Sequence, residues 1–216
     1  MSNAILTHPV RLYYSSDSGV TFTELVEVKN YPNLFTPAEG VDKTTLAQSQ
    51  ETMIKGIKGA EMMEFECNYN KEDFNTVYEL EDNALVYKLS FGENDADGAF
   101  IWSGEHAVTM PSGDINSIVN MLVTVYPSSE VLPSINITLA NSSPTVTTSG
   151  TSDEAVTTYP AGATVTYSSD DVTKFTVDGD GLVSGVGEGT ADLIIEASYD
   201  GYFTTTTTVE VTVTTP

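Results

Sequence analysis

The sequence predicts a mainly β protein made of two domains. Apolar and polar residues alternate in short runs throughout both halves of the chain, which is the period of a half-buried strand. Clusters of turn-forming residues separate these runs. The composition changes near residue 130: Met, Trp and Cys stop at Met121, and 7 of the 8 Lys and Arg residues lie in the first part. We therefore expect one domain at 1–130, a linker at 131–141 and a second domain at 142–216.

The first domain is expected to be a β-sandwich or barrel with one packed α-helix and a long loop. Asp17, Ser18 and Gly19 form a turn signal between two alternating runs. The stretch 32–59 fits neither the strand period nor the helix period, and such long segments in compact domains are usually functional or mobile. From these residues alone, an interaction arm and a passive loop are equally good readings. Strands are expected over 10–16, 21–28, 60–69, 85–91, 98–110 and 115–126.

One short helix is expected between the third and fourth of these strands. Asn70 can cap its first turn, and Glu72 and Asp73 stand where the helix dipole favours negative charge. Three residues have the spacing of a single helical face, so we expect that face to pack on the sheet. The residues of this face are Phe74, Val77 and Tyr78.

The second domain is expected to be a small immunoglobulin-like β-sandwich. Runs rich in Val and Thr alternate and are broken by turn clusters. The segment TYSSDDVTKFTVDGDGLVSGVGEGTADLIIEASYDG, residues 166–201, has an aromatic strand, then Ser-Ser-Asp, then an Asp-Gly-Leu-Val hairpin, then Gly-Thr-Ala. In this order it resembles the bacterial immunoglobulin-like domain of the group-2 type, over about residues 142–214. That family usually has Trp where Tyr167 stands here, and the resemblance does not specify a ligand.

A glycine-rich stretch at 178–197 raises the question of a phosphate or metal site. A phosphate-binding loop leads into a helix, whereas GVGEGT leads into the strand-like run ADLIIEASY. A helical-type calcium loop needs oxygen ligands at regular positions, and Leu182 and Val183 occupy two of them. We therefore expect two hairpin turns around a short strand, LVSGV, and neither a phosphate nor a metal site.

Residues suited to catalysis are scarce, so we expect no enzymatic activity, no cofactor and no metal. His8 precedes a proline, and His106 lies in an expected strand beside Glu105; we interpret both histidines as surface residues. Cys67 alternates with apolar residues, which predicts a core position. A zinc site needs more Cys or His than the chain contains. With 31 acidic residues in the chain, neighbouring carboxylates identify no site.

The net charge and the apolar runs restrict the environment of the protein. The chain has 8 basic and 31 acidic residues, a formal charge of -23, which disfavours binding to nucleic acid or anionic membranes. Its apolar runs are too short to span a membrane, and its N-terminus lacks the basic and apolar regions of a signal peptide. A single cysteine excludes an internal disulfide framework, so cytosolic assembly is expected.

A second resemblance covers most of residues 5–130 and depends on the order of several short motifs. The motifs are Asp42 with Thr44, Thr45 and Leu46; Glu51, Thr52 and Ile54; Gly56 and Ile57; Glu64 and Phe65; and Asn68 and Tyr69. In this order the segment resembles the major tail tube protein of bacteriophages with long, non-contractile tails. The runs FIWSG and GDINSIVNMLVTVYPSSE resemble the last strands of that family. An immunoglobulin-like C-terminal domain is a known arrangement on such proteins.

The resemblance implies a structural virion protein whose hexameric rings stack into a tube, with phage DNA passing through the lumen without specific binding. It implies assembly in the bacterial host cytoplasm with tape-measure, tail-tip and tail-terminator proteins as partners. The second domain would decorate the outside and bind host cell-surface glycans, without membrane insertion. The expected subunit interface lies in the long loop and comprises Asp42, Lys43, Thr44, Thr45, Leu46, Ile54, Lys55 and Lys58.

Charge is consistent with this function but does not select it. The first 130 residues carry 20 acidic and 7 basic residues, which allows a negative lumen that repels phosphates within a Debye length of about 8 Å. Ordinary acidic solubility explains the same charge equally well. We expect exposed strand edges to pair around the ring, and the three lysines of the loop to meet acidic patches on neighbours. The alternative function is a bacterial surface adhesin or cell-wall-binding module, which would ordinarily carry a secretion signal and tandem repeats.

Overall fold

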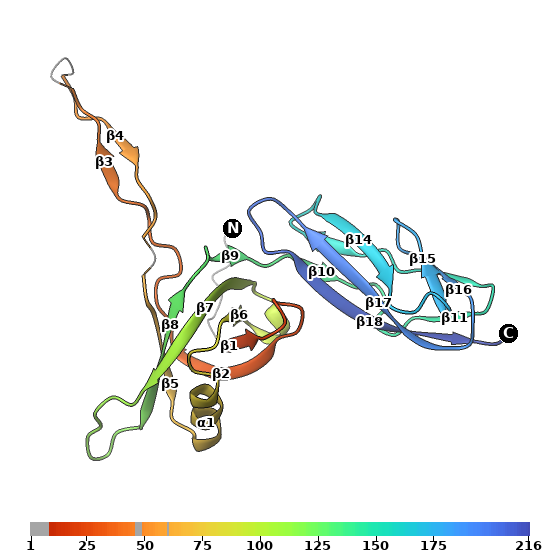
Figure 1. The fold of residues 1–216 in the computed structure, drawn as a ribbon, viewed down its shortest axis with the longest axis horizontal. Helices are drawn as coiled ribbons and strands as arrows, with labels where there is room; N and C mark the ends of the chain where they lie inside the picture. Colours follow the sequence, from red (N-terminus) through yellow and green to blue (C-terminus); the bar gives the residue numbers. More distant parts are fainter. Residues whose placement is uncertain (1–8, 46–48, 60) are drawn as a thin grey trace, which may run out of the picture.

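The structure is a computed structural model that describes residues 9–45, 49–59 and 61–216. It confirms the predicted fold class: a β-barrel with one short helix is followed by a small β-sandwich (Figure 1). The two lie next to each other along the longest axis of the molecule, and a thin two-stranded arm projects from the barrel (Figure 1). His8 and Leu46 lie outside the described residues.

The first domain is a closed antiparallel barrel. Its strands are β1 (Val10–Ser15), β2 (Thr23–Asn30), β5 (Met63–Asn68), β6 (Leu85–Phe91), β7 (Ala99–Thr109) and β8 (Asn120–Pro127). They follow the order β6-β1-β2-β5-β8-β7, and β6 also pairs with β7, which closes the ring. Closure removes free strand edges. The expected pairing of exposed strand edges around a ring stays a prediction, and it would have to use strands outside the closed barrel.

The barrel interior is filled by the side chains that alternation places on one face of each strand. Phe65 and Trp102 lie in the centre with their rings stacked at 6.0 Å, and both are buried. Cys67 is 0 % exposed, as predicted, and burial raises the pKa of its thiol to about 12. The thiol is therefore a packing group rather than a nucleophile.

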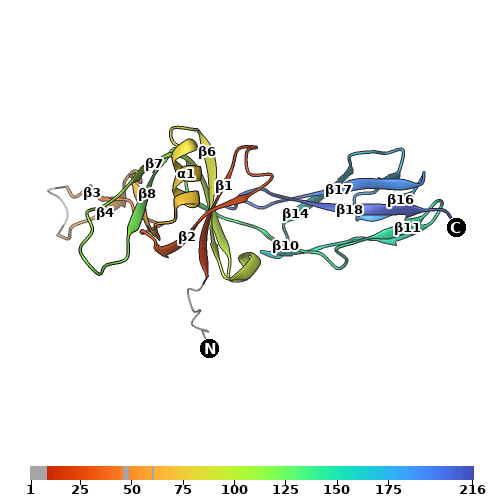
Figure 2. The same ribbon diagram turned by 90° about the horizontal axis from the view of Figure 1, so that it is seen from below.

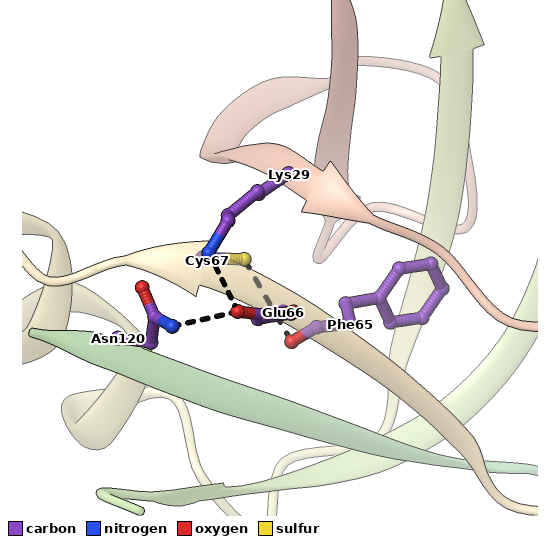
Figure 3. A network of polar contacts seen from close by, with 5 residues as sticks. All are labelled: Lys29, Phe65, Glu66, Cys67 and Asn120. Atoms are coloured by element: carbon purple, nitrogen blue, oxygen red, sulfur yellow. Dashed lines mark hydrogen bonds and ion pairs between the residues drawn. The ribbon is translucent and has the colours of Figure 1, made fainter. Parts of the chain in front are cut away.

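The barrel is least regularly paired between β2 and β5. Register partners there are Val28 with Cys67 and Asn30 with Glu66, with an irregularity between them. Side chains support this junction: Lys29 Nζ lies 2.8 Å from Glu66 Oε1, which also accepts a 2.6 Å hydrogen bond from Asn120 Nδ2 (Figure 3). Glu66 thereby connects β2, β5 and β8 on the outside of the barrel.

The predicted helix is present as α1 (Lys71–Glu79) and is capped as expected. Asn70 Oδ1 accepts a 2.9 Å hydrogen bond from the Glu72 backbone N–H. Val77 is fully buried and Phe74 packs partly against the barrel core. Tyr78 was expected on the same buried face, but it is 60 % exposed and stacks on Phe74 from outside. A helix of nine residues covers the sheet with a narrow stripe, and Tyr78 lies beyond it.

His106 was expected at the surface and is instead 1 % exposed. Its Nε2 lies 2.8 Å from the carbonyl oxygen of Val77, and its Nδ1 lies 2.7 Å from the hydroxyl of Tyr87. Because a carbonyl only accepts, Nε2 carries the proton and Nδ1 accepts from Tyr87. The imidazole thus joins α1 to strands β6 and β7 as a neutral bridge.

The region between β7 and β8 differs from the expected strand at 115–126. Strand β8 begins at Asn120, and residues 110–119 form an exposed loop. Ile115 is 94 % exposed and Ile118 is 70 % exposed. The apolar alternation that indicated a strand here belongs to a surface that this chain leaves uncovered.

The second domain contains two main sheets around its own apolar core. Its strands are β10 (Asn136–Thr138), β11 (Thr145–Thr147), β12 (Thr151–Asp153), β13 (Thr157–Tyr159), β14 (Thr164–Ser169), β15 (Phe175–Val177), β16 (Leu182–Gly185), β17 (Gly189–Ser198) and β18 (Thr205–Thr214). One sheet has the order β11-β18-β17-β14 and the other β12-β16-β15, while β10 pairs with β13. Figure 2 shows the long β17 and β18 strands side by side, with the C-terminus at the end of β18. Phe175, Leu193, Ile195 and Val211 are fully buried between the sheets.

The glycine-rich stretch turns the chain as expected in its first half and differently in its second. Strands β15 and β16 form a hairpin, and Asp178 Oδ1 accepts from the backbone N–H groups of Asp180 and Leu182 at 3.0 and 2.9 Å. Gly181 has a φ of +90°, which favours glycine. The second turn is not a hairpin, because β16 and β17 belong to different sheets. It carries the chain across the sandwich.

Residues 131–141, where we expected a linker, connect the two domains through paired strands. Strand β9 (Leu132–Pro133) pairs with β7 of the barrel, and β10 belongs to the second domain. Phe203 of the second domain donates its backbone N–H to Pro133 at 2.9 Å, and its ring covers Gly19 of the barrel. A Cβ at Gly19 would lie 2.7 Å from that ring. The two domains therefore make a direct, tightly fitted contact.

Candidate functional site

The largest structural feature outside the two packed cores is the arm between β2 and β5. It contains the short antiparallel strands β3 (Gly40–Asp42) and β4 (Met53–Lys55) and projects well away from the barrel (Figures 1 and 2). Every residue of both strands is exposed. Apolar side chains on the arm are uncovered, with Met53 66 %, Val41 50 % and Ile54 47 % exposed. An apolar ribbon of this kind is typical of a surface that another molecule covers.

Local hydrogen bonds connect the two sides of the arm next to β3 and β4. Asp42 Oδ1 accepts from the Thr44 backbone N–H at 2.7 Å and from the Thr44 hydroxyl at 2.5 Å. Both hydrogen bonds lower the pKa of Asp42, and the one from the Thr44 hydroxyl has the larger effect. The Thr52 backbone N–H donates to Thr44 Oγ1 at 2.9 Å, and Lys43 N–H donates to the Thr52 carbonyl at 2.9 Å. Thr44 thus connects the two sides of the arm, and Asp42 holds Thr44 in place.

The eight residues predicted at a subunit interface divide between the arm and its base. Asp42 is the last residue of β3, and Lys43, Thr44 and Thr45 come directly after it. Ile54 and Lys55 lie on β4 opposite Val41 and Gly40. Leu46 lies outside the described residues. The structure thus brings Asp42, Lys43, Thr44, Ile54 and Lys55 onto one ribbon, with Lys58 several residues below.

Lys58 has a partner within its own chain. Its ammonium forms an ion pair with Glu130, which follows β8. The hydrogen bond and charge of Lys58, with a smaller contribution from Lys55, lower the pKa of Glu130. Both groups are about half exposed, so the pair contributes little to stability, but it marks where the returning side of the arm meets the barrel.

A groove of about 520 Å³ lies at this base of the arm. Sequence reasoning missed this groove, because its walls come from segments far apart in the chain. Its apolar lining includes Leu34, Phe35, Ile57, Met63 and Val131. Phe35 packs edge-on against Phe100 at 5.2 Å, which holds one wall on the barrel. The groove is therefore a mainly apolar hollow whose lining also includes the Lys58–Glu130 pair.

The exposed loop at 110–119 is the second uncovered apolar surface that sequence reasoning missed. Its tip is ordered by Ser117, whose hydroxyl donates to the Asp114 carbonyl at 2.6 Å and accepts from the Asp114 N–H at 3.1 Å. Asn116 has a φ of +64°, as in a tight turn. The tip therefore has a defined shape although Ile115 and Ile118 are exposed.

The described residues include neither a cluster of metal ligands nor a membrane-spanning helix. Within them, no group of three or more His, Cys, Asp or Glu residues is placed to hold a metal ion. No helix in the described part of the chain is long and apolar enough to cross a membrane. The histidine that the structure places, His106, is buried and neutral because burial lowers its pKa.

Comparison with known proteins adds no assignment. No protein-family model matches the sequence, and no curated protein matches it. The functional argument therefore depends on the geometry described above.

Proposed function

We propose that this protein is a structural subunit of a bacteriophage tail tube, which polymerises as stacked hexameric rings and forms the conduit for DNA ejection. The observation that carries the proposal is the arm, whose strands present Val41, Met53 and Ile54 to solvent. Removing apolar surface from water is favourable by about 25 cal/mol for each Å² that is buried. An ordered apolar ribbon that projects from its own domain gains this stabilisation by lying on a neighbouring copy.

The charge of the chain requires such specific contacts. At -23 per copy, subunits repel one another, so association needs surfaces that are locally apolar or complementary. Lys43 and Lys55 place positive charge on the arm of an acidic protein. In the proposed assembly these two lysines meet carboxylates of a neighbour, while Lys58 keeps Glu130 as its partner in the same chain.

The proposed lumen is acidic. The outward faces of the barrel strands carry Glu27 on β2, Glu64 on β5 and Glu105 on β7, all of them exposed. Repulsion between such carboxylates and DNA phosphates lets the DNA pass without specific binding. The proposed partners are further copies of this chain, together with tape-measure, tail-tip and tail-terminator proteins, and the proposed location is the virion tail, assembled in the host cytoplasm.

In the proposed tube the second domain decorates the outside and contacts host glycans. A cleft of about 660 Å³ at the junction of the two domains supports a binding role. It is lined by aromatic residues, including Tyr159, Tyr202 and Phe203, and by amides of Asn94 and Asn136. Concave sites with aromatic walls and a few polar groups are typical of small-ligand binding.

The same cleft favours a second candidate function, a bacterial surface adhesin or cell-wall-binding module. In that case the second domain would bind the ligand and the arm would play no part in assembly. The two candidates differ in the role of the arm, so variants of the arm distinguish them.

The test replaces the apolar arm residues Met53 and Ile54 with serine in the full chain. The matched control replaces Val172, which is 63 % exposed in the second domain, with serine. Negative-stain electron microscopy of concentrated protein is expected to show tubes or rings for the wild type and the control, and monomers for the arm variant. Normal tubes from the arm variant would contradict the proposed role of the arm.

A further inference from the structure

Three exposed apolar side chains of the barrel domain gather in one loop. In the β7–β8 loop, residues 110–119, Ile115 is 94 % exposed, Ile118 70 % and Val119 52 %. The hydrogen bonds between Asp114 and Ser117 fix the turn that presents them. A preformed turn loses little conformational freedom on binding, which favours its use as a docking element.

The apolar groove at the base of the arm is the surface that fits such a loop. Its volume is about 520 Å³, and its walls include Leu34, Phe35 and Ile57 from the arm, and Val131 after β8. Ile57 is 93 % exposed and Phe35 is 55 % exposed, so both lack cover within the chain. The groove and the loop are thus two uncovered apolar surfaces on one domain.

The loop and the groove lie at opposite ends of the same strand. The loop immediately precedes β8, and the groove contains Pro127 and the residues that follow it. Figure 1 shows the loop at one end of β8 and the arm leaving near the other. A strand of eight residues spans about 27 Å. A second copy displaced along β8 therefore brings its loop to the groove of the first.

The charges of the loop and of the groove are few and partly paired. The loop carries one charged residue, Asp114, in ten positions. The groove is lined by Lys58, Glu61 and Glu130, and Lys58 forms an ion pair with Glu130. Lys55 also lies near enough to Glu130 to help lower its pKa. Docking therefore brings Asp114 to a lining with one basic and two acidic residues, and the apolar side chains carry the contact.

We propose that the β7–β8 loop of one copy docks into the groove at the arm base of the next copy, head to tail. The contact is heterologous, because the loop and the groove are different surfaces, and a displacement along one direction generates an open-ended stack. This inference depends on the proposed self-assembly and specifies its stacking contact. It assigns Ile115 and Ile118 to the interface, neither of which belongs to the predicted set of interface residues.

Disulfide trapping tests the contact directly in the full chain. Ile115→Cys is made in one preparation and Ile57→Cys in another, and the two are mixed at assembly concentration under mild oxidation. A disulfide forms when the Cα atoms come within about 4.4–6.8 Å, so trapping reports a specific geometry. Cys67 is fully buried and gives little background. The control mixes Ile115→Cys with Val172→Cys, which is exposed in the second domain.

A covalent dimer from the Ile115 and Ile57 pair, at least tenfold above the control, is the expected result. A second experiment uses the double variant Ile115→Ser, Ile118→Ser. This variant is expected to form no long assemblies, while its Trp102 fluorescence and its unfolding midpoint stay unchanged. Tubes without trapping, or tubes from the serine variant, would overturn this contact and leave the proposed tube standing. Trapping without tubes would retain the contact and contradict the tube. Monomers without trapping would overturn both.

Discussion

Replacing Tyr87 with phenylalanine tests the bridge that holds α1 to the barrel. The Tyr87 hydroxyl and His106 Nδ1 are 2.7 Å apart, and both residues are buried. The substitution removes one oxygen and leaves the aromatic ring in place, so packing against Trp102 is retained. His106 Nδ1 then remains buried without a donor, which costs about 1–3 kcal/mol. With a urea m-value of about 2 kcal/mol/M, a loss of 2 kcal/mol lowers the unfolding midpoint by about 1 M.

The assay is urea unfolding followed by tryptophan fluorescence. Trp102 is the single tryptophan and lies in the barrel core, so its emission reports the unfolding of the barrel rather than of the second domain. The matched control is Tyr126→Phe, because Tyr126 is 47 % exposed and its change is expected to stay within about 0.5 kcal/mol. Equal midpoints for the Tyr87 and Tyr126 variants would refute the role of the Tyr87–His106 bridge.

Three further predictions concern pH and the domain contact. Burial lowers the pKa of His106 below its usual 6.5, so the unfolded state binds more protons than the folded state just below pH 6.5. The free energy of unfolding is therefore expected to fall with acidification by up to about 1.4 kcal/mol per pH unit. Urea unfolding at several pH values measures this slope, which His106→Gln should remove. Hydrogen bonds from Ser15 and then Thr21 lower the pKa of Asp17 to about 2, so its stabilising contribution is present above 3.8 and is lost as pH falls through about 2; a carboxyl titration by NMR with a midpoint near 3.8 would contradict this. Phe203→Ala should broaden the range of domain orientations seen by small-angle X-ray scattering, whereas an unchanged profile would show that the ring does not fix the junction.

The sequence predicted those elements whose residues are buried by their own domain. Strand β5 is an example: Met63, Phe65 and Cys67 alternate because one face meets the barrel core, and the structure places all three inside. Helix α1 was predicted from its cap and its apolar spacing for the same reason. The prediction that Tyr78 is buried was wrong, because spacing gives the direction of a side chain but not the width of the surface that covers the helix.

His106 shows a signal that was present and overlooked. Counting by twos along β7 from Trp102 passes through Gly104 to His106, so the strand period places this imidazole on the inner face. The interpretation as a surface residue followed from its polarity and its charged neighbour instead. The partner that makes burial tolerable, the Val77 carbonyl, comes from a helix 29 positions away and is not visible in the local sequence.

The candidate site was only partly predictable because it is not buried by its own chain. The β3–β4 ribbon of the arm has no clear period, since every residue of both strands is exposed. The loop at 110–119 has the opposite problem: its apolar residues resemble a strand, although they are exposed. Periodicity reports which side chains avoid water, and it does not report whether the covering surface belongs to the same molecule.

The most direct test of the central claim is electron microscopy of the concentrated, purified full chain over a range of salt concentrations. The account predicts hollow tubes or stacked rings, favoured by added salt because screening reduces the repulsion between copies that each carry a charge of -23. Monomers at every concentration and salt level would contradict self-assembly and favour a binding role for the domain junction.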